Sequence, residues 1–395
     1  MSDSNDPVVI VGIARTPMGG FLGELSSISA TSLGSTAISA AVARAGLESE
    51  AVEEVIMGCV LPAGLGQAPA RQASLGAGLP KSTGCTTINK VCGSGMKAIM
   101  LANDLLLAGT NKVMVAGGME SMSNAPHLLP NARSGYRFGH GKLVDHMAFD
   151  GLEDAYEGSA MGVYAETCAD KYSFSREEQD DYAITSLKRA QAAIESGAFA
   201  DEITPVSYSH RGKDIEVSVD EQPMKARFDK IPQLRPAFKK DGTVTAANAS
   251  SISDGAAAVV MMRQSEAQAR GLKPLAKIVA HTSHAQQPSE FTMAPIGAIK
   301  SLFEKTGWNK DSVDLFEINE AFAVVPMAAM REHDLDHNKV NINGGACALG
   351  HPIGCSGTRI VVTLLAALAK QGKSKGIASL CIGGGEATAL AVELI

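Results

Sequence analysis

The chain has 395 residues, a formal net charge of −7, and 45% hydrophobic but only 5% aromatic residues. Its length predicts two or three domains, and its 40 glycines fit a compact α/β protein with many tight connections. The composition excludes disordered and fibrous classes, and the acidic balance argues against nucleic acid as a partner.

The first part of the chain alternates predicted strands and helices. Runs of apolar, mostly β-branched residues predict strands at 8–12, 55–58 and 112–116. Amphipathic patterns that end at a glycine predict helices at 33–45 and 96–108. This alternation favours a mostly parallel sheet.

The middle of the chain, roughly 120–250, breaks this alternation and is interpreted as an insertion. Its clearest element is a helix with Ser175 as N-cap and Glu178 three positions later, which is predicted to end at Gly197. Residues 210–240 hold eight basic and five acidic residues, a net charge of +3. This segment suits either a surface for a phosphorylated small molecule or an ordinary solvated loop.

The C-terminal third repeats the plan of the first part. Strands are predicted at 315–318 and 376–382, and helices at 321–331 and 357–370. The order Gly93-Ser94-Gly95, helix, strand, Gly117-Gly118 is matched by Cys355-Ser356-Gly357, helix, strand, Gly383-Gly384-Gly385. We therefore expect an internal duplication.

The cysteines indicate a reducing environment. The seven cysteines show no CxxC pair and no zinc spacing, so neither a metal site nor a disulfide framework is expected. An odd count predicts free thiols and a cytoplasmic location. The polar segment Met1–Asp6 is unlike a secretory or mitochondrial leader, and no apolar run is long enough to span a membrane.

Cys92 is the strongest candidate for chemistry. It precedes Gly93-Ser94-Gly95 at a predicted strand-to-helix turn, where the positive end of the helix dipole would favour the thiolate. A lone cysteine is more often a small buried hydrophobe, so this motif alone leaves both interpretations open.

Three further motifs lie where predicted strands end, a common place for ligands in open α/β sheets. They are Asn319-Glu320-Ala321-Phe322-Ala323, the glycine-rich loop 344–357 that contains His351, and Cys381-Ile382-Gly383-Gly384-Gly385. None of the glycine-rich stretches has the spacing of a Walker A motif or a dinucleotide fingerprint.

Together these motifs resemble the thiolase family. The resemblance covers nearly the whole chain and extends to three further stretches: Arg15-Thr16-Pro17, Gly117–Ser123, and Asn248-Ala249-Ser250 before Ser253–Ala256. It implies an α/β thiolase fold with two duplicated βαβαβαββ halves in a five-layered αβαβα core. An inserted loop domain would cover coenzyme A. The implied boundaries are 1–119 with 251–272 for the N-terminal half, 120–250 for the loop domain and 273–395 for the C-terminal half.

The resemblance implies an acyltransferase of fatty acid metabolism, an acetyl-CoA C-acetyltransferase. It would condense two acetyl-CoA molecules to acetoacetyl-CoA and coenzyme A, or run the thiolytic reverse, through an S-acetyl-cysteine intermediate. The alternative is a degradative 3-ketoacyl-CoA thiolase for longer chains. Decarboxylating ketoacyl synthases share the fold, but Cys381 as a second acid–base group favours a thiolase. A non-enzymatic carrier would be expected to lack at least one of the four catalytic side chains, and all four are present.

The resemblance also assigns roles to individual residues. Cys92 would accept the acyl group, His351 would take the Cys92 proton, and Cys381 would move the proton of the second acetyl group. His351 and a water held by Asn319 would stabilise the enolate, and the N–H groups of Cys92 and Gly383 the tetrahedral intermediate. We expect the site to lower the pKa of the cysteine thiols.

For coenzyme A, Ser250 matches a position that binds the pantetheine arm, and Arg227 one that lies against the adenine or its phosphate. Met161 matches a residue that crowds the acyl pocket, but Ala160 stands where many short-chain members have His. No prosthetic group is expected. The expected partners are acetyl-CoA, acetoacetyl-CoA, coenzyme A and further copies of the chain in a homotetramer.

Overall fold

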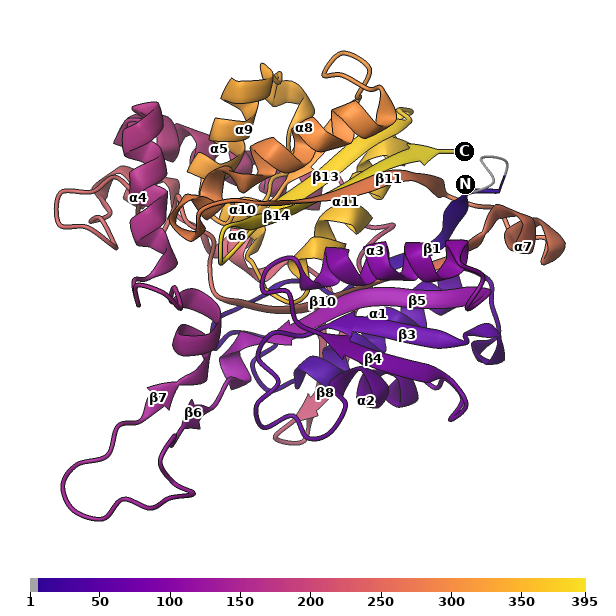
Figure 1. The fold of residues 1–395 in the computed structure, drawn as a ribbon, viewed down its shortest axis with the longest axis horizontal. Coiled ribbons are helices and arrows are strands. Elements are labelled where there is room, and N and C mark those ends of the chain that lie inside the picture. Colours follow the sequence, from indigo (N-terminus) through magenta and orange to yellow (C-terminus); the bar gives the residue numbers. More distant parts are fainter. Residues whose placement is uncertain (1–5) are drawn as a thin grey trace.

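The computed structural model describes residues 6–395, so residues 1–5 of the polar N-terminal segment lie outside the described part. One ten-stranded sheet has two halves, called here the N-terminal and C-terminal sheets. Each carries helices on its outer side, and together they enclose a central pair of helices, which gives five layers (Figure 1). The N-terminal sheet is covered by α1 (Ala30–Arg44) and α2 (Pro69–Gly76), and the C-terminal sheet by α8 (Ala294–Thr306) and α9 (Val324–His333). The central layer is formed by α3 (Ser94–Leu107) and α11 (Ser356–Gln371).

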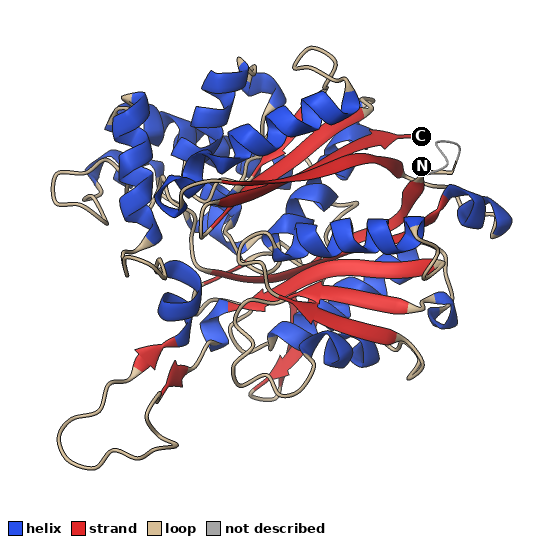
Figure 2. Cartoon of the chain, viewed as in Figure 1, coloured by secondary structure: helices blue, strands red, loops and turns tan. Residues whose placement is uncertain are grey.

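The strands of each half lie side by side in a fixed order (Figure 2). In the N-terminal half this order is β4 (Gly84–Ile88), β3 (Glu54–Gly58), β5 (Val113–Ser121), β10 (Ser253–Arg263) and β1 (Val8–Arg15). In the C-terminal half it is β12 (Leu315–Ile318), β13 (Lys375–Ile382), β14 (Glu386–Leu394) and β11 (Ala276–Ala285). The two halves join through the short antiparallel pairing of β1 with β11.

The expected duplication is confirmed by the pairing pattern. Strands β3 and β5 are parallel, as are β12 and β13. The next two pairs of each half, β5–β10–β1 and β13–β14–β11, are antiparallel. A tight turn at Gly383–Gly385 connects β13 to β14, whereas residues 122–252 connect β5 to β10. The insertion therefore replaces a hairpin turn and leaves the sheet intact.

The expectation of a mostly parallel sheet is wrong, because most neighbouring strands are antiparallel. The antiparallel partners β10, β11 and β14 were not recognised in the sequence. β10 is rich in small residues, and buried and half-buried residues alternate in β11 instead of forming a continuous apolar run. Helices therefore connect parallel neighbours only among β3, β4 and β5 in one half and between β12 and β13 in the other.

Most predicted elements lie where they were expected, with informative differences at their ends. β5 continues through Gly117 and Gly118 to Ser121. Helix α9 begins at Val324, three residues later than predicted, because the turn before it bonds to the insertion: the Ser250 N–H donates to the Ala321 carbonyl (2.9 Å). The capping box at Ser175 and Glu178 is confirmed at the start of α5 (Arg176–Glu195).

A buried ion cluster fastens the insertion to the N-terminal half. The fully buried Arg15 guanidinium bonds Glu202 at 2.6 Å and Asp220 at 2.7 and 2.9 Å. The remaining helices and strands are short or belong to the insertion: α4 (Met161–Tyr172), α6 (Glu221–Lys225), α7 (Gln264–Ala269), α10 (Ala346–Leu349), β2 (Gly19–Gly20), β6 (His127–Leu128), β7 (Val144–Asp145), β8 (Val206–His210) and β9 (Lys213–Val217). Among residues 6–395, no helix is both long and apolar enough to cross a membrane.

The N-terminal turns of α3 and α11 touch at glycines that correspond in the duplication. A Cβ at Gly95 would lie 2.8 Å from the Thr358 backbone nitrogen, and one at Gly357 would lie 2.3 Å from the Met96 nitrogen. Such distances to backbone atoms leave no room for a side chain. The two helices can therefore approach this closely only because both positions are glycine.

We predict that Gly357→Ala lowers the thermal unfolding midpoint far more than Gly109→Ala. The first change forces the backbones of the central helices apart, at a cost above about 3 kcal/mol. The second places Ala at a positive φ of 74° with open space around its Cβ, which costs about 1–2 kcal/mol. Equal shifts for the two variants would contradict a close-packed crossing at Gly357.

Candidate active site

The predicted strand-to-helix turn before α3 is present and is strained. Val91 has φ +46°, a conformation that β-branched residues rarely adopt. Two side chains hold it: Asn89 Oδ1 accepts from the Val91 N–H (2.8 Å), and Ser94 Oγ donates to the Val91 carbonyl (2.6 Å). The turn places Cys92 directly before the first residues of α3.

Cys92 is half-buried in the wall of a cavity of about 490 Å³. Burial raises the pKa of its thiol to about 11, although the N–H groups of Gly383 and of Cys92 itself lower it. The expectation that the site lowers this pKa is therefore wrong, because desolvation outweighs the two N–H groups. A thiol in this setting needs a base to become a nucleophile.

His351 lies in the wall of the same cavity and is suited to act as that base. Its Nδ1 is 2.5 Å from Ser356 Oγ, which also lies 3.0 Å from the Pro352 carbonyl. Because a carbonyl only accepts, the Ser356 hydroxyl donates to Pro352 and accepts from Nδ1–H. This leaves Nε2 without a proton. Burial, with a smaller effect of the Arg359 charge, lowers the His351 pKa to about 3, so the ring is neutral.

Asn319 is buried beside His351. Its Nδ2 lies 3.5 Å from His351 Nε2, and its Oδ1 lies 3.5 Å from Arg359 Nη2. Both contacts are at the long end of the hydrogen-bond range. Asn319 follows β12, and its own N–H donates to the Ser379 carbonyl of β13 at 3.0 Å. The side chain thus reaches the site from the C-terminal sheet.

Cys381 lies near the end of β13 and is fully buried. Burial, and then the nearby Cys92 thiolate, raise its pKa well above that of a free thiol. This again differs from the expected lowering. Gly383 follows β13 and lines the cavity, and its N–H faces the Cys92 sulfur. The two cysteines therefore belong to one site.

Met161 and Ser250 also line this cavity, together with three aromatic rings at its mouth and wall. These rings are Phe238, Phe291 and Phe322, and they pack edge to face. The Met161 methyl would lie 3.5 Å from a Cβ placed on Gly383. Met161 therefore packs close to Gly383, whose N–H faces the Cys92 sulfur. Most of the lining is accordingly apolar, and its polar side chains besides Cys92 and His351 are Glu153, Ser250 and Ser251.

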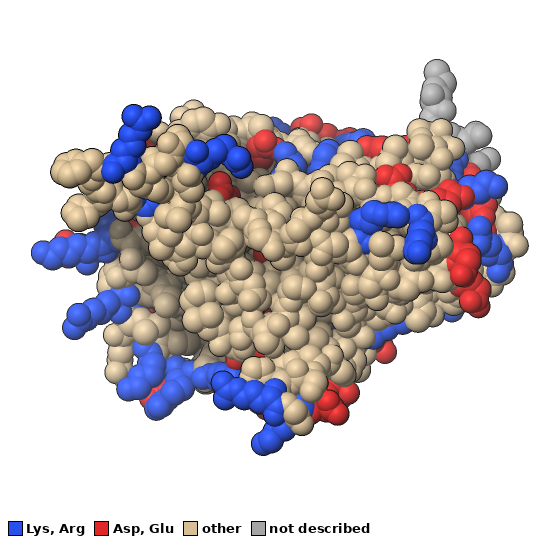
Figure 3. Space-filling view, turned by 90° about the horizontal axis from the view of Figure 1, so that it is seen from below, with Lys and Arg blue, Asp and Glu red and all other residues tan. Residues whose placement is uncertain are grey.

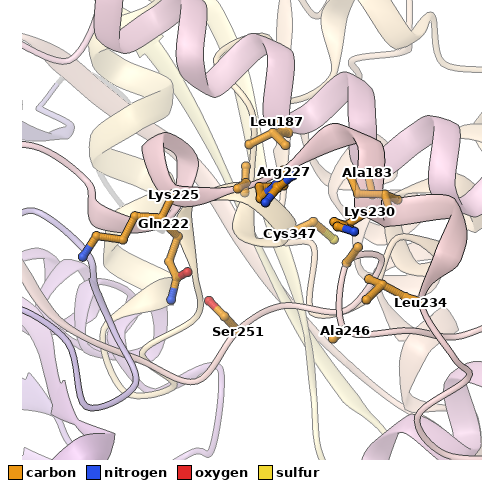
Figure 4. Close-up of a pocket in the computed structure, with 14 residues that line it drawn as sticks. Ala183, Leu187, Gln222, Lys225, Arg227, Lys230, Leu234, Ala246, Ser251 and Cys347 are labelled. Atoms are coloured by element: carbon orange, nitrogen blue, oxygen red, sulfur yellow. The ribbon is translucent and has the colours of Figure 1, made fainter.

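Arg227 does not line this cavity but a second one of about 280 Å³ (Figure 4). Lys225 and Lys230 share that cavity, and Arg227 pairs with Asp229 at 3.1 Å. Ala246 and Ser251 line both cavities, which are therefore adjacent. On the face in Figure 3, Lys and Arg side chains gather around a hollow at the end of the molecule that carries α4.

A buried carboxylate holds the His351 loop against the Cys92 half. Glu120 of β5 accepts hydrogen bonds from the backbone N–H groups of Val60 (2.9 Å), Leu61 (3.1 Å) and Gly354 (2.9 Å). Burial raises its pKa to about 7, and these N–H groups oppose the rise. Glu120 therefore joins the loop after β3 to the loop that carries His351.

Sequence reasoning did not assign Ser356 and Arg359. Ser356 stood inside the glycine-rich motif, but its bond to His351 depends on the fold of the loop. Arg359 carried a signal that was not used: it is a single charge within the long apolar run of α11. A charge in such a position needs a buried polar partner.

Within the described residues, no cluster of three or more His, Cys, Asp or Glu side chains could hold a metal ion. The side chains that converge on the cavity are nucleophilic and acid–base groups with backbone donors. Such a set can form and break a covalent bond between the Cys92 sulfur and a carbonyl carbon.

The family comparison matches nearly the whole length of the chain. The model of the thiolase N-terminal domain matches residues 8–265, and that of the thiolase C-terminal domain matches residues 272–394. The protein named acetyl-CoA acetyltransferase 2 of Arabidopsis thaliana is 54% identical over 400 aligned positions, which cover 100% of this chain and 99% of the relative.

Two solved structures share the fold at full length. The Acat5 thiolase from Ascaris suum, solved in complex with coenzyme A, has a TM-score of 0.94 and 45% identity, covering 98% of this chain and 100% of its own. The acetyl-CoA acetyltransferase of Bacillus anthracis has a TM-score of 0.96 and 42% identity, covering 98% and 99%. The five-layered architecture is thus common to these proteins.

We predict that alkylation of Cys92 by iodoacetamide keeps accelerating up to about pH 10. Burial disfavours the thiolate, so the folded-state pKa of about 11 lies above the value of about 8.5 for a free thiol. At pH 8.5 a free thiol is half ionised, whereas Cys92 is almost wholly protonated. Peptide mass spectrometry measures the rate, with N-acetylcysteine as reference. A plateau at or below pH 8.5 would show that the site stabilises the thiolate instead.

Proposed function

The chain belongs to the thiolase family, and on that premise we propose that it is an acetyl-CoA C-acetyltransferase. It interconverts two acetyl-CoA with acetoacetyl-CoA and coenzyme A through an S-acetyl group on Cys92. One observation carries the proposal: a nucleophile with two N–H donors at its sulfur, Cys92, shares a cavity with the neutral base His351 and neighbours a second cysteine.

The thiolytic direction begins with acetoacetyl-CoA in the cavity. His351 Nε2 takes the Cys92 proton, and the thiolate attacks the ketone carbon. The N–H groups of Cys92 and Gly383 stabilise the oxyanion that forms. The bond between C2 and C3 then breaks, leaving the acetyl group on Cys92 and an acetyl-CoA enolate. The raised pKa keeps Cys381 as a thiol, the form needed to protonate the enolate carbon.

The enolate oxygen faces a different set of donors. The protonated His351 Nε2 and a water held by Asn319 would stabilise this oxygen. In comparable oxyanion sites, one such donor stabilises the transition state by about 2.7–4 kcal/mol. Once acetyl-CoA has left, the His351 proton returns to the Cys381 thiolate. His351 then takes the proton of the incoming coenzyme A thiol. The new thiolate attacks the acetyl group, and Cys92 leaves and recovers the proton from His351.

Coenzyme A would extend across the two adjacent cavities. Lys225, Arg227 and Lys230 supply positive charge for the phosphorylated nucleotide in the second cavity. The pantetheine arm would pass Ser251 and reach Cys92, with Ser250 as a hydrogen-bonding partner. The Ascaris suum thiolase, which shares this fold, was solved in complex with coenzyme A, and this supports coenzyme A as the ligand. No prosthetic group is part of the proposal.

The acetyl specificity of the proposal is supported by relatives rather than by a single residue. The Arabidopsis and Bacillus proteins both carry the name acetyl-CoA acetyltransferase. Met161 narrows the space above Gly383, in keeping with a short acyl group. These observations favour the acetyl enzyme over a degradative thiolase for longer chains.

We also propose a homotetramer in the cytoplasm, with the loop domain at 120–250 between halves at 1–119 with 251–272 and at 273–395. The arm between β6 and β7 projects from the body and exposes large apolar side chains, including Leu129 and Phe138 (Figure 1). β4 is an edge strand of the N-terminal sheet. Both features suit contacts with further copies of the chain. All seven cysteines are free thiols, which suits a reducing compartment.

We predict that Cys381→Ser separates the two half-reactions. Thiolysis of acetoacetyl-CoA should fall by about 10³-fold, since the acid for the enolate is lost. Exchange of label between coenzyme A and acetyl-CoA needs only Cys92 and His351, so it should fall less than about tenfold, in line with a small effect of losing a neighbouring thiol.

The matched variant Cys92→Ser should lose both reactions, and Cys85→Ser, on the edge strand outside the site, should lose neither. Thiolysis by Cys381→Ser close to the wild-type rate would remove Cys381 from the mechanism. Exchange of label between coenzyme A and acetyl-CoA by Cys92→Ser would show that Cys92 does not carry the acetyl group.

A further inference from the structure

Arg359 is a fully buried arginine within the apolar helix α11. Among the described residues, its Nε and Nη1 atoms have no hydrogen-bond partner. Its nearest carboxylate oxygen, Glu317 Oε2, is 3.7 Å from Nη1, too far for a hydrogen bond. Burying a guanidinium with so few partners costs several kcal/mol, so this side chain does not serve stability alone.

The Arg359 group that does have a partner points to the active site. Its Nη2 lies 3.5 Å from Asn319 Oδ1. A guanidinium can only donate hydrogen bonds, so it requires the amide oxygen of Asn319 on its own side. The amide NH₂ must then face the opposite way, toward His351 Nε2 at 3.5 Å.

The His351 side sets the same orientation independently. Ser356 fixes the proton on Nδ1, so Nε2 is an acceptor and must meet the NH₂ end of the Asn319 amide. Ser356 and Arg359 are three residues apart on α11 and so lie on one face of the helix. One turn of α11 thus orients both His351 and Asn319.

We propose that Arg359 is a positioning residue that holds the Asn319 amide with its NH₂ toward the water that stabilises the enolate oxygen. The inference rests on the proposed function, in which Asn319 helps to stabilise that enolate. At the enolate stage His351 Nε2 carries the Cys92 proton and no longer accepts from the amide. Without Arg359 the amide could then turn by half a rotation and present its oxygen toward the developing negative charge. Arg359 touches no substrate and acts through Asn319.

The charges around Arg359 are consistent with this role. Glu317, its nearest carboxyl, has a pKa raised to about 8 by burial, so at neutral pH it is mostly protonated. Burial also raises the pKa of Glu202, and the positive charges of Arg15 and Arg359 oppose this rise. The Arg359 charge is therefore not cancelled by Glu317, and it also lowers the pKa of His351.

The test is a double-mutant cycle on thiolysis, with Arg359→Met in the wild-type and the Asn319→Ala backgrounds. In the wild-type background we expect kcat to fall by about 30- to 100-fold, approaching the loss of one oxyanion donor. KM for acetoacetyl-CoA should change less than about threefold, because the substrate does not touch Arg359. In the Asn319→Ala background, Arg359→Met should cause no further loss of kcat.

Two controls separate positioning from packing. Glu317→Gln replaces the carboxyl nearest to Arg359 but leaves the Asn319 contact, so its kcat should stay near that of the wild type. Arg359→Lys, which keeps a cationic donor, should recover at least part of the lost kcat. If Arg359→Met does not fold, Glu317→Gln/Arg359→Met, which removes the neighbouring carboxyl together with the guanidinium, takes its place in the cycle.

Two results would overturn the inference while the wild type remains active. One is a kcat of Arg359→Met within threefold of the wild-type kcat. The other is the same fold loss in both backgrounds, which would mean that Arg359 acts without Asn319. A wild-type protein without thiolysis would instead overturn the proposed function.

Discussion

The site depends on how closely α3 and α11 approach each other in the central layer. Gly95 and Gly357 let the backbones touch where any side chain would collide. Each helix carries one part of the site at its N-terminal end: Cys92 precedes α3, and His351 precedes α11. Because the two halves arose by duplication of one strand–turn–helix plan, the contact brings equivalent turns together. The chemistry then comes from what differs between the turns.

Buried charges hold these turns in place, at a cost in stability. Glu120 joins the loop after β3 to the His351 loop through three backbone N–H groups. Arg15 fastens the insertion, and Arg359 reaches Asn319. Several atoms of this network, such as Glu202 Oε2 and Arg359 Nε, have no partner among the described residues. A core chosen for stability alone would fill these places with apolar groups. The polar network instead fixes the direction of each donor.

The residues of the site were easier to predict from the sequence than the directions of the strands in the sheet. Cys92, His351 and Cys381 stood in short motifs that contain glycines, and Asn319 stood directly after a predicted strand, so their part in the site followed from local patterns. The expected strand before the His351 loop was wrong, since His351 follows the short helix α10. Strand direction did not follow, because β10 and β11 pair with neighbours far away in the chain and carry small or half-buried residues. The ionisation of Cys92 was also mispredicted, since burial depends on packing that no local motif reveals. For the same reason Ser356 and Arg359 acquired roles only once α11 was seen against Asn319 and His351. The roles of the site residues stay predictions until they are measured.

The central claim is that Cys92 carries the acyl group while Cys381 does not. The most direct measurement is peptide mass spectrometry after a brief incubation with isotopically labelled acetyl-CoA and acid quenching. The account predicts one labelled acetyl group on the peptide that contains Cys92, and its removal when unlabelled coenzyme A is added before the quench. Label on the Cys381 peptide, or no thioester on any cysteine, would contradict it.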